Sequence, residues 1–178
     1  MYSFQRADRH SPSIFGGPLC AKISSGASDS KRLHLIACLG GWHIPVLNRA
    51  RLIELPLIYG MQYDACQMKY RVDYGHRIEL LQLEPSAPSD DWPYANYPAL
   101  LPYVPLRLDD TPRRVGYEEF ASRFPNMPER QSADLVVAVP PPATVGVSLW
   151  GRGDGAGVTI VFECDLKERT VSVTNLTS

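Results

Sequence analysis

The sequence predicts an α+β domain built on a predominantly antiparallel β-sheet of about eight strands, with one or two short helices packed on it. Several segments alternate apolar and polar residues with a period of two and end at glycine-containing turns. The last third of the chain is rich in valine and threonine, which favour strands. The best predicted helix has three aromatic residues spaced three and four positions apart, and no internal repeat has a fixed period.

The first half of the chain contains four predicted strands. Residues 33–39 alternate before two glycines, which predicts a strand ending in a turn. A proline that blocks helix continuation precedes a buried strand at residues 57–62. The clearest pattern is a hairpin formed by residues 66–72 and 77–83, because a glycine-containing turn separates two alternating runs.

The second half contains the predicted helix, roughly residues 116–124. Its aromatic residues Tyr117, Phe120 and Phe124 recur three and four positions apart, and Pro125 ends it. Five further strands are predicted at residues 104–110, 133–140, 145–151, 158–165 and 169–176.

The length of 178 residues predicts a single globular domain, residues 1–178, in which residues 1–31 form a loosely organised N-terminal segment rich in turn residues. A hydrophobic content of 44% with 21% charged residues is typical of a folded protein rather than a disordered one. A chain of this size buries roughly 70% of its unfolded surface, which is enough for a core without disulfides or metals.

Charge and hydropathy argue against nucleic acid and membranes as partners. The net charge of −1 provides no broad attraction to nucleic acid or to anionic lipid. No apolar run reaches the roughly 18 residues of a membrane span, and no signal peptide begins the chain, so we expect a cytoplasmic protein. The cysteines lie far apart without a C-x-x-C pair, which predicts separate thiols in a reducing compartment. They are Cys20, Cys38, Cys66 and Cys164.

Residues 90–106, here called the proline strap, combine prolines with aromatic residues. Proline fixes φ and removes a hydrogen-bond donor, so this segment is expected along a sheet edge or over the surface, not inside a sheet. Its aromatic side chains can pack inward as a cover over the core, or face outward as rigid contact area for a partner. These side chains are Trp92, Tyr94, Tyr97 and Tyr103.

No motif for catalysis, metal binding or cofactor binding occurs in the sequence. It contains no G-x-S-x-G and no H-E-x-x-H, and no His and Cys residues at metal-ligand spacing, so we expect no metal and no cofactor. A catalytic thiol needs a nearby base, and four residues could supply such a site at strand ends. They are Cys66, His43, His76 and Asp64.

The sequence therefore favours a non-catalytic cytosolic protein-binding domain, of which a bacterial immunity or adaptor protein that caps a toxin or effector is one form. The expected contact residues are the four aromatic residues of the proline strap together with Arg113 and Arg114, whose guanidinium groups suit a carboxylate. Two alternatives remain open. One is an enzyme, a hydrolase using the Cys66 site, and the other is a module that binds a small ligand between aromatic side chains.

Overall fold

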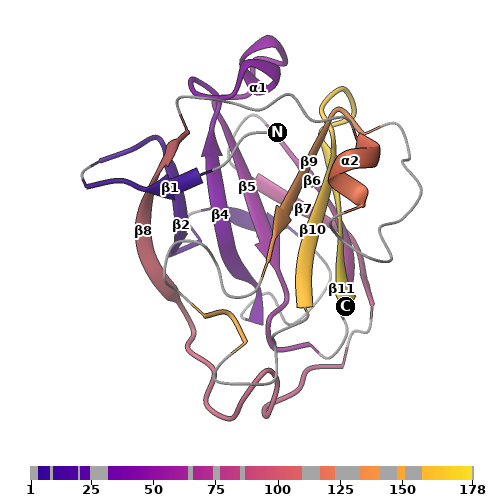
Figure 1. Ribbon diagram of the computed structural model, residues 1–178. Coiled ribbons are helices and arrows are strands. Elements are labelled where there is room, and N and C mark those ends of the chain that lie inside the picture. Colours follow the sequence, from indigo (N-terminus) through magenta and orange to yellow (C-terminus); the bar gives the residue numbers. More distant parts are fainter. Residues whose placement is uncertain are drawn as a thin grey trace.

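The computed structural model describes residues 4–8, 10–19, 21–24, 32–63, 66–73, 77–84, 87–109, 117–122, 133–140, 148–150 and 158–177. Within these residues the chain forms two β-sheets packed face to face (Figure 1). The strands are β1 (Phe4–Arg6), β2 (Ser13–Gly17), β3 (Lys22–Ser24), β4 (His34–Gly40), β5 (Glu54–Tyr59), β6 (Gln67–Val72), β7 (Arg77–Glu84), β8 (Leu101–Leu108), β9 (Leu135–Val139), β10 (Val158–Asp165) and β11 (Thr170–Thr177). The helices are α1 (Pro45–Arg49) and α2 (Tyr117–Ala121).

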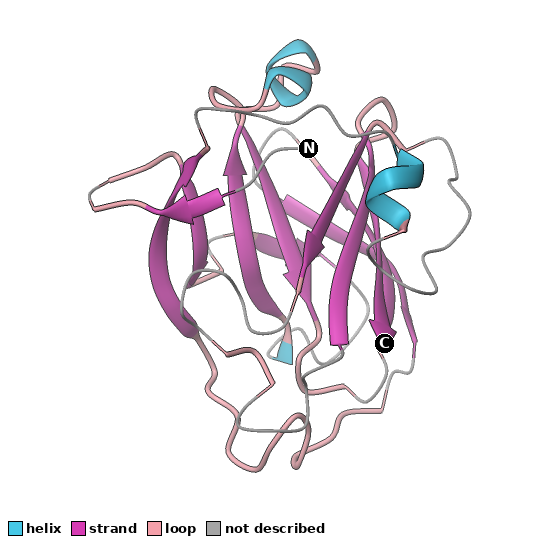
Figure 2. Ribbon diagram, viewed as in Figure 1, coloured by secondary structure: helices cyan, strands magenta, loops and turns pink. Residues whose placement is uncertain are grey.

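The predicted α+β class is wrong, because the protein is essentially all-β (Figure 2). Each helix has only five residues, which is too short to form a layer against a sheet. The first sheet has the order β1-β8-β2-β4-β5 and is antiparallel throughout. The second has the order β3-β7-β6-β11-β10-β9, and only β3 and β7 pair in parallel.

The local patterns of the sequence are confirmed where alternation was strongest. The predicted hairpin is present as β6 and β7, with Val72 opposite Ile78. Strands β4, β9, β10 and β11 also lie where alternation predicted them. Strand β5 begins at Glu54, earlier than predicted, and includes Pro56, which an edge strand of a sheet tolerates.

The prediction that the proline strap stays outside a sheet is wrong for its second half, because β8 lies between β1 and β2. Both prolines of β8 fall at interruptions of the ladders. The Pro105 carbonyl accepts the Ala7 N–H (2.8 Å) just past the end of β1, so its missing donor faces the end of that ladder. Pro102 lies opposite a bulge at Gly16, where φ is +64° and an added Cβ would lie 2.2 Å from the Pro102 oxygen.

Three further segments can be compared with their predictions. The described part of the N-terminal segment, predicted to be loosely organised, contributes β1, β2 and β3, and β2 is an inner strand of the first sheet. Helix α2 lies inside the predicted helix but is shorter. Of the strand predicted at residues 145–151, only residues 148–150 are described; they do not form a strand, and Leu149 and Trp150 belong to the core.

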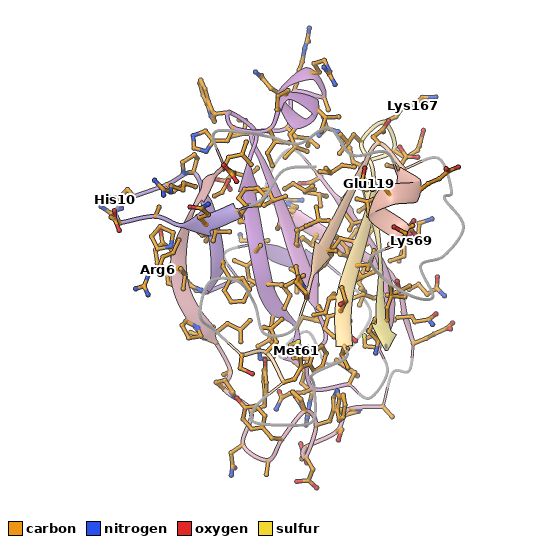
Figure 3. All side chains as sticks on the ribbon, viewed as in Figure 1. Arg6, His10, Met61, Lys69, Glu119 and Lys167 are labelled. Carbon is orange, nitrogen blue, oxygen red and sulfur yellow. The ribbon has the colours of Figure 1, made fainter. Side chains whose placement is uncertain are left out.

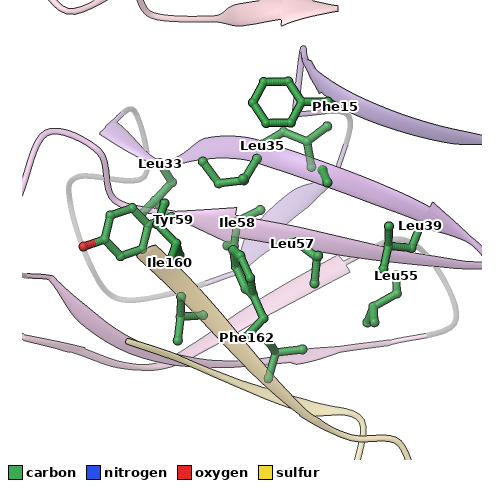
Figure 4. Packing of buried hydrophobic residues seen from close by; sticks show 14 of the residues in the cluster. Phe15, Leu33, Leu35, Leu39, Leu55, Leu57, Ile58, Tyr59, Ile160 and Phe162 are labelled. Carbon is green, nitrogen blue, oxygen red and sulfur yellow. The ribbon is translucent and has the colours of Figure 1, made fainter. Parts of the chain in front are cut away.

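The core fills the space between the sheets (Figure 4). Phe15 and Leu57 contribute from the first sheet, and Phe162 contributes from the second. The buried Tyr70 of β6, an inner strand of the second sheet, reaches the edge strand β5 of the first sheet: its hydroxyl donates to the Pro56 carbonyl (2.9 Å) and accepts the Ile58 N–H (3.2 Å). This hydroxyl satisfies backbone groups that the edge strand β5 would otherwise leave unpaired inside the protein.

Candidate functional site

The first half of the proline strap packs inward at two of its predicted contact residues. Tyr97 is buried and donates its hydroxyl to the Leu149 carbonyl (3.0 Å). The half-buried Trp92 lies with its ring centre 6.0 Å from that of Trp150. Burial raises the pKa of the Tyr97 phenol, which therefore stays a hydrogen-bond donor at neutral pH. These rings stabilise the protein's own core.

Two polar contacts hold the same segment against the start of β4. Both ring nitrogens of His34 face carbonyl oxygens, with Nε2 2.8 Å from Pro98 and Nδ1 3.2 Å from Arg32. The Arg32 guanidinium also forms an ion pair with Asp90 (2.8 Å). His34 is only 2% exposed, and burial lowers the pKa of its imidazole, so it is neutral at pH 7.

Other predicted contact residues of the strap face solvent. Tyr94 is exposed, and Tyr103 is 52% exposed on β8. Tyr94 keeps its ring centre 5.0 Å from that of Tyr97, so part of its surface rests on the inward set. The predicted contacts Arg113 and Arg114 lie outside the described residues.

The structure does not bring Cys66 and His43 together. His43 is exposed just beyond β4, whereas Cys66 follows the opposite end of β5, near Met61 at the lower end of Figure 3. A strand of six residues spans roughly 20 Å, far more than a hydrogen bond. Cys66 is fully buried, which raises the pKa of its thiol to about 12 and keeps it protonated. His76 and Asp64 lie outside the described residues.

The described residues provide neither a cluster of metal ligands nor a membrane-spanning helix. They contain no group of three or more His, Cys, Asp and Glu side chains that could hold a metal ion. No helix among them is both long and apolar enough to span a bilayer.

Residues 41–53, here called the α1 loop, expose the two most accessible large apolar side chains of the described structure. Trp42 is 80% exposed and Ile53 is 69% exposed. The Gly41 N–H donates to the Ile53 carbonyl (2.7 Å), so the backbone beside Trp42 lies next to Ile53. The loop, which includes α1, lies at one end of the two packed sheets, at the top of Figure 1. An exposed tryptophan beside an exposed isoleucine is typical of a binding surface.

The α1 loop is anchored by a different set of apolar residues. Ile44, Leu47 and Leu52 point into the core and are nearly or fully buried. A side chain at position 41 would meet the backbone, because a Cβ there would lie 1.8 Å from the Leu52 oxygen. The loop thus has separate inward and outward apolar residues, and its exposed pair is not needed to hold it in place.

The end of α1 has the Schellman arrangement of hydrogen bonds. Leu52 N–H donates to the Leu47 carbonyl and Arg51 N–H to the Asn48 carbonyl, both at 3.0 Å. Arg51 takes the left-handed position of this motif (φ 55°), where glycine is preferred. A cation therefore occupies a strained position beside Trp42 and Ile53, and such strain often accompanies functional sites.

A groove beside α1 continues this end of the molecule. It is open, has a volume of about 510 Å³, and lies between α1 and the turn that joins β10 to β11, where Figure 3 labels Lys167. We call it the basic groove, because the described charged residues of its lining are three cations and one carboxylate. Its lining residues are Val46, Arg49, Ala50, Asp134, Leu166, Lys167 and Arg169.

Sequence reasoning did not select Trp42 or Ile53 as candidate contact residues. The available signal was a tryptophan directly after two glycines, a turn context in which a large apolar side chain need not be buried. Comparison with protein-family models, curated proteins and solved structures finds no significant match for this chain.

Proposed function

We propose that this protein is a non-catalytic protein-binding domain whose contact surface is the α1 loop, with Trp42 and Ile53 as its apolar anchors. The observation that carries the proposal is the exposure of these two side chains, 80% and 69%, on a loop already anchored by other residues. Burying a large apolar side chain from water stabilises a complex by about 1.5–3 kcal/mol. Neither side chain has that burial within the described structure.

The surroundings of the pair also suit a protein partner. Arg49 and Arg51 are exposed on the same loop, and tryptophan and arginine are both enriched at interface hot spots. The loop is held by the buried Leu47, so binding would require little ordering. The strap is less suitable, because Tyr97 is buried and hydrogen-bonded within the protein. An immunity or adaptor protein remains one form of this function.

Site-specific photo-crosslinking in the native host tests the proposal. A photoreactive phenylalanine analogue replaces Trp42, Ile53 or, as a control, the exposed Leu81 on β7. We expect positions 42 and 53 to crosslink the same protein of defined mass, and position 81 not to do so. The same products at all three positions, or none at position 42, would contradict the proposal.

The crosslinked protein is then purified and titrated with the unmodified domain. Trp42→Ala should weaken binding by about 30-fold, corresponding to about 2 kcal/mol for a hot-spot residue. Leu81→Ala should bind like wild type. Thermal unfolding controls for damage, because truncating a side chain that is 80% exposed should leave the melting temperature nearly unchanged.

A further inference from the structure

The basic groove is assembled from segments far apart in the sequence. Arg49 comes from the last turn of α1, whereas Lys167 and Arg169 come from the β10–β11 turn. Among the described lining residues, Asp134, which immediately precedes β9, is the only carboxylate. The chain as a whole has a net charge of −1, so this local excess of cations is not a consequence of a basic protein.

Two acidic residues near the groove, Asp134 and Asp165, accept hydrogen bonds from backbone N–H groups, whereas Glu168 is exposed in the same turn. Asp134 Oδ2 accepts the Leu166 N–H (2.9 Å). Asp165 Oδ1 accepts the N–H groups of Lys167 (3.0 Å) and Glu168 (2.9 Å). Because these bonds fix the turn, the cationic wall of the groove is ordered before any ligand arrives.

Two of the three described cations, one on each side of the groove, are accessible to a ligand. Arg49 and Lys167 are exposed, and neither forms an ion pair with another described residue. The lining also includes the apolar side chains Val46 and Leu166. The ligand that suits this lining carries carboxylates together with small apolar groups, which is the chemistry of an acidic peptide segment.

We infer that the basic groove binds an acidic segment of a protein partner, with Arg49 and Lys167 pairing with its carboxylates. This inference rests on the proposed function and extends it, because Arg49 belongs to the α1 loop that carries Trp42 and Ile53. One partner would then place an apolar patch on the exposed pair and an acidic segment in the groove. Trp42 and Ile53 would supply most of the affinity for this partner, and the groove would favour partners whose segment is acidic.

A direct binding measurement uses two fluorescein-labelled decapeptides with alternating Glu-Ala or Lys-Ala sequence, and fluorescence anisotropy as the readout. We expect the acidic peptide to bind and the basic peptide not to bind. Raising the NaCl concentration from about 50 to about 300 mM should weaken binding of the acidic peptide several-fold, because salt screens partly exposed charges.

Charge reversal identifies the site. The double variant Arg49→Glu/Lys167→Glu should bind the acidic peptide at least tenfold more weakly than wild type. The matched control Lys69→Glu/Arg77→Glu changes the net charge equally on the exposed residues of β6 and β7, and should bind like wild type. Equal weakening in both double variants would show a general charge effect and overturn the inference. So would a failure of the acidic peptide to bind.

Vesicle binding distinguishes an anionic membrane from an acidic peptide as the ligand of the groove. Sedimentation with vesicles containing phosphatidylserine should leave the wild-type protein in the supernatant. Vesicle binding that the Arg49→Glu/Lys167→Glu variant loses, without binding of the acidic peptide, would make the ligand an anionic lipid and overturn the inference.

Two further results separate this inference from the proposed function. If Trp42→Ala weakens binding of the crosslinked partner but the Arg49→Glu/Lys167→Glu variant binds this partner like wild type, the groove inference is wrong and the proposed function stands. If the acidic peptide binds in the groove but Trp42→Ala leaves partner binding unchanged, the proposed contact surface is wrong and the groove inference stands.

Discussion

His34 Nε2 lies 2.8 Å from the carbonyl oxygen of Pro98, and this contact ties the beginning of β4 to a segment 64 residues further along the chain. His34 Nδ1 faces a second carbonyl oxygen, that of Arg32, at 3.2 Å. Carbonyl oxygens only accept hydrogen bonds, and a neutral imidazole has one N–H. The shorter contact therefore assigns the proton to Nε2, which donates to Pro98.

The first prediction concerns the pH dependence of stability. Burial lowers the pKa of folded His34 below its unfolded value of 6.5. The unfolded chain therefore binds more protons as the pH falls below 6.5, and the free energy of unfolding decreases with falling pH. One proton changes this free energy by at most about 1.4 kcal/mol per pH unit. His34→Gln should remove this component from urea unfolding curves measured between pH 7 and about pH 5.

The exposed His43 provides the matched control for this measurement. His43→Gln should keep the pH dependence of the wild type, because its side chain does not leave solvent on folding. Parallel stability curves for wild type and His34→Gln over that range would show that His34 is not the group responsible.

The second prediction separates the structural and exposed residues of the proline strap. Tyr97→Ala removes a buried ring and leaves the Leu149 carbonyl without its donor, so we expect a loss of about 3 kcal/mol or more. Tyr103→Ala should lose only about 1 kcal/mol, because the residue is 52% exposed and strand preferences span about that much. Chemical unfolding measures both variants, and equal losses would be inconsistent with this packing.

The third prediction concerns Arg51 at the end of α1. A non-glycine residue in the left-handed region is strained by about 1–2 kcal/mol, whereas glycine loses about 0.5–1 kcal/mol more chain entropy on folding. Arg51→Gly should therefore raise the free energy of unfolding by about 0.5 kcal/mol, since φ is 55° there. Arg51→Ala keeps the strained conformation and removes the charge, so it should not gain this stability. A destabilised glycine variant would argue against a left-handed residue at this position.

The fourth prediction tests the sealed environment of Cys66. Because its thiol is fully buried and has a pKa of about 12, a thiol-specific reagent should label it only when the protein unfolds. The half-buried Cys38 provides the internal comparison and should react faster. Peptide mapping by mass spectrometry after timed labelling distinguishes the two. Rapid labelling of native Cys66 would restore the thiol-based enzyme as a serious alternative.

Local patterns were sufficient for the parts of the fold that alternate. In β6, Met68, Tyr70 and Val72 are buried and the residues between them are exposed, and a period of two predicts this without knowledge of the neighbouring strands. The five-residue α2 shows the opposite case. Its aromatic spacing correctly predicted a helix, but the spacing did not predict that the helix is too short to form a layer.

The sequence by itself determined the strand-forming segments, the hairpin of β6 and β7, and the absence of recognisable catalytic motifs. Only the tertiary structure decided which aromatic residues are exposed and which are buried. Tyr97 and Trp42 are both large apolar side chains beside turn residues, yet one is buried and the other is 80% exposed. The physical reason is that burial depends on which distant segment covers a side chain. Leu149 and His34 lie against Tyr97, and the α1 loop is anchored by residues other than Trp42.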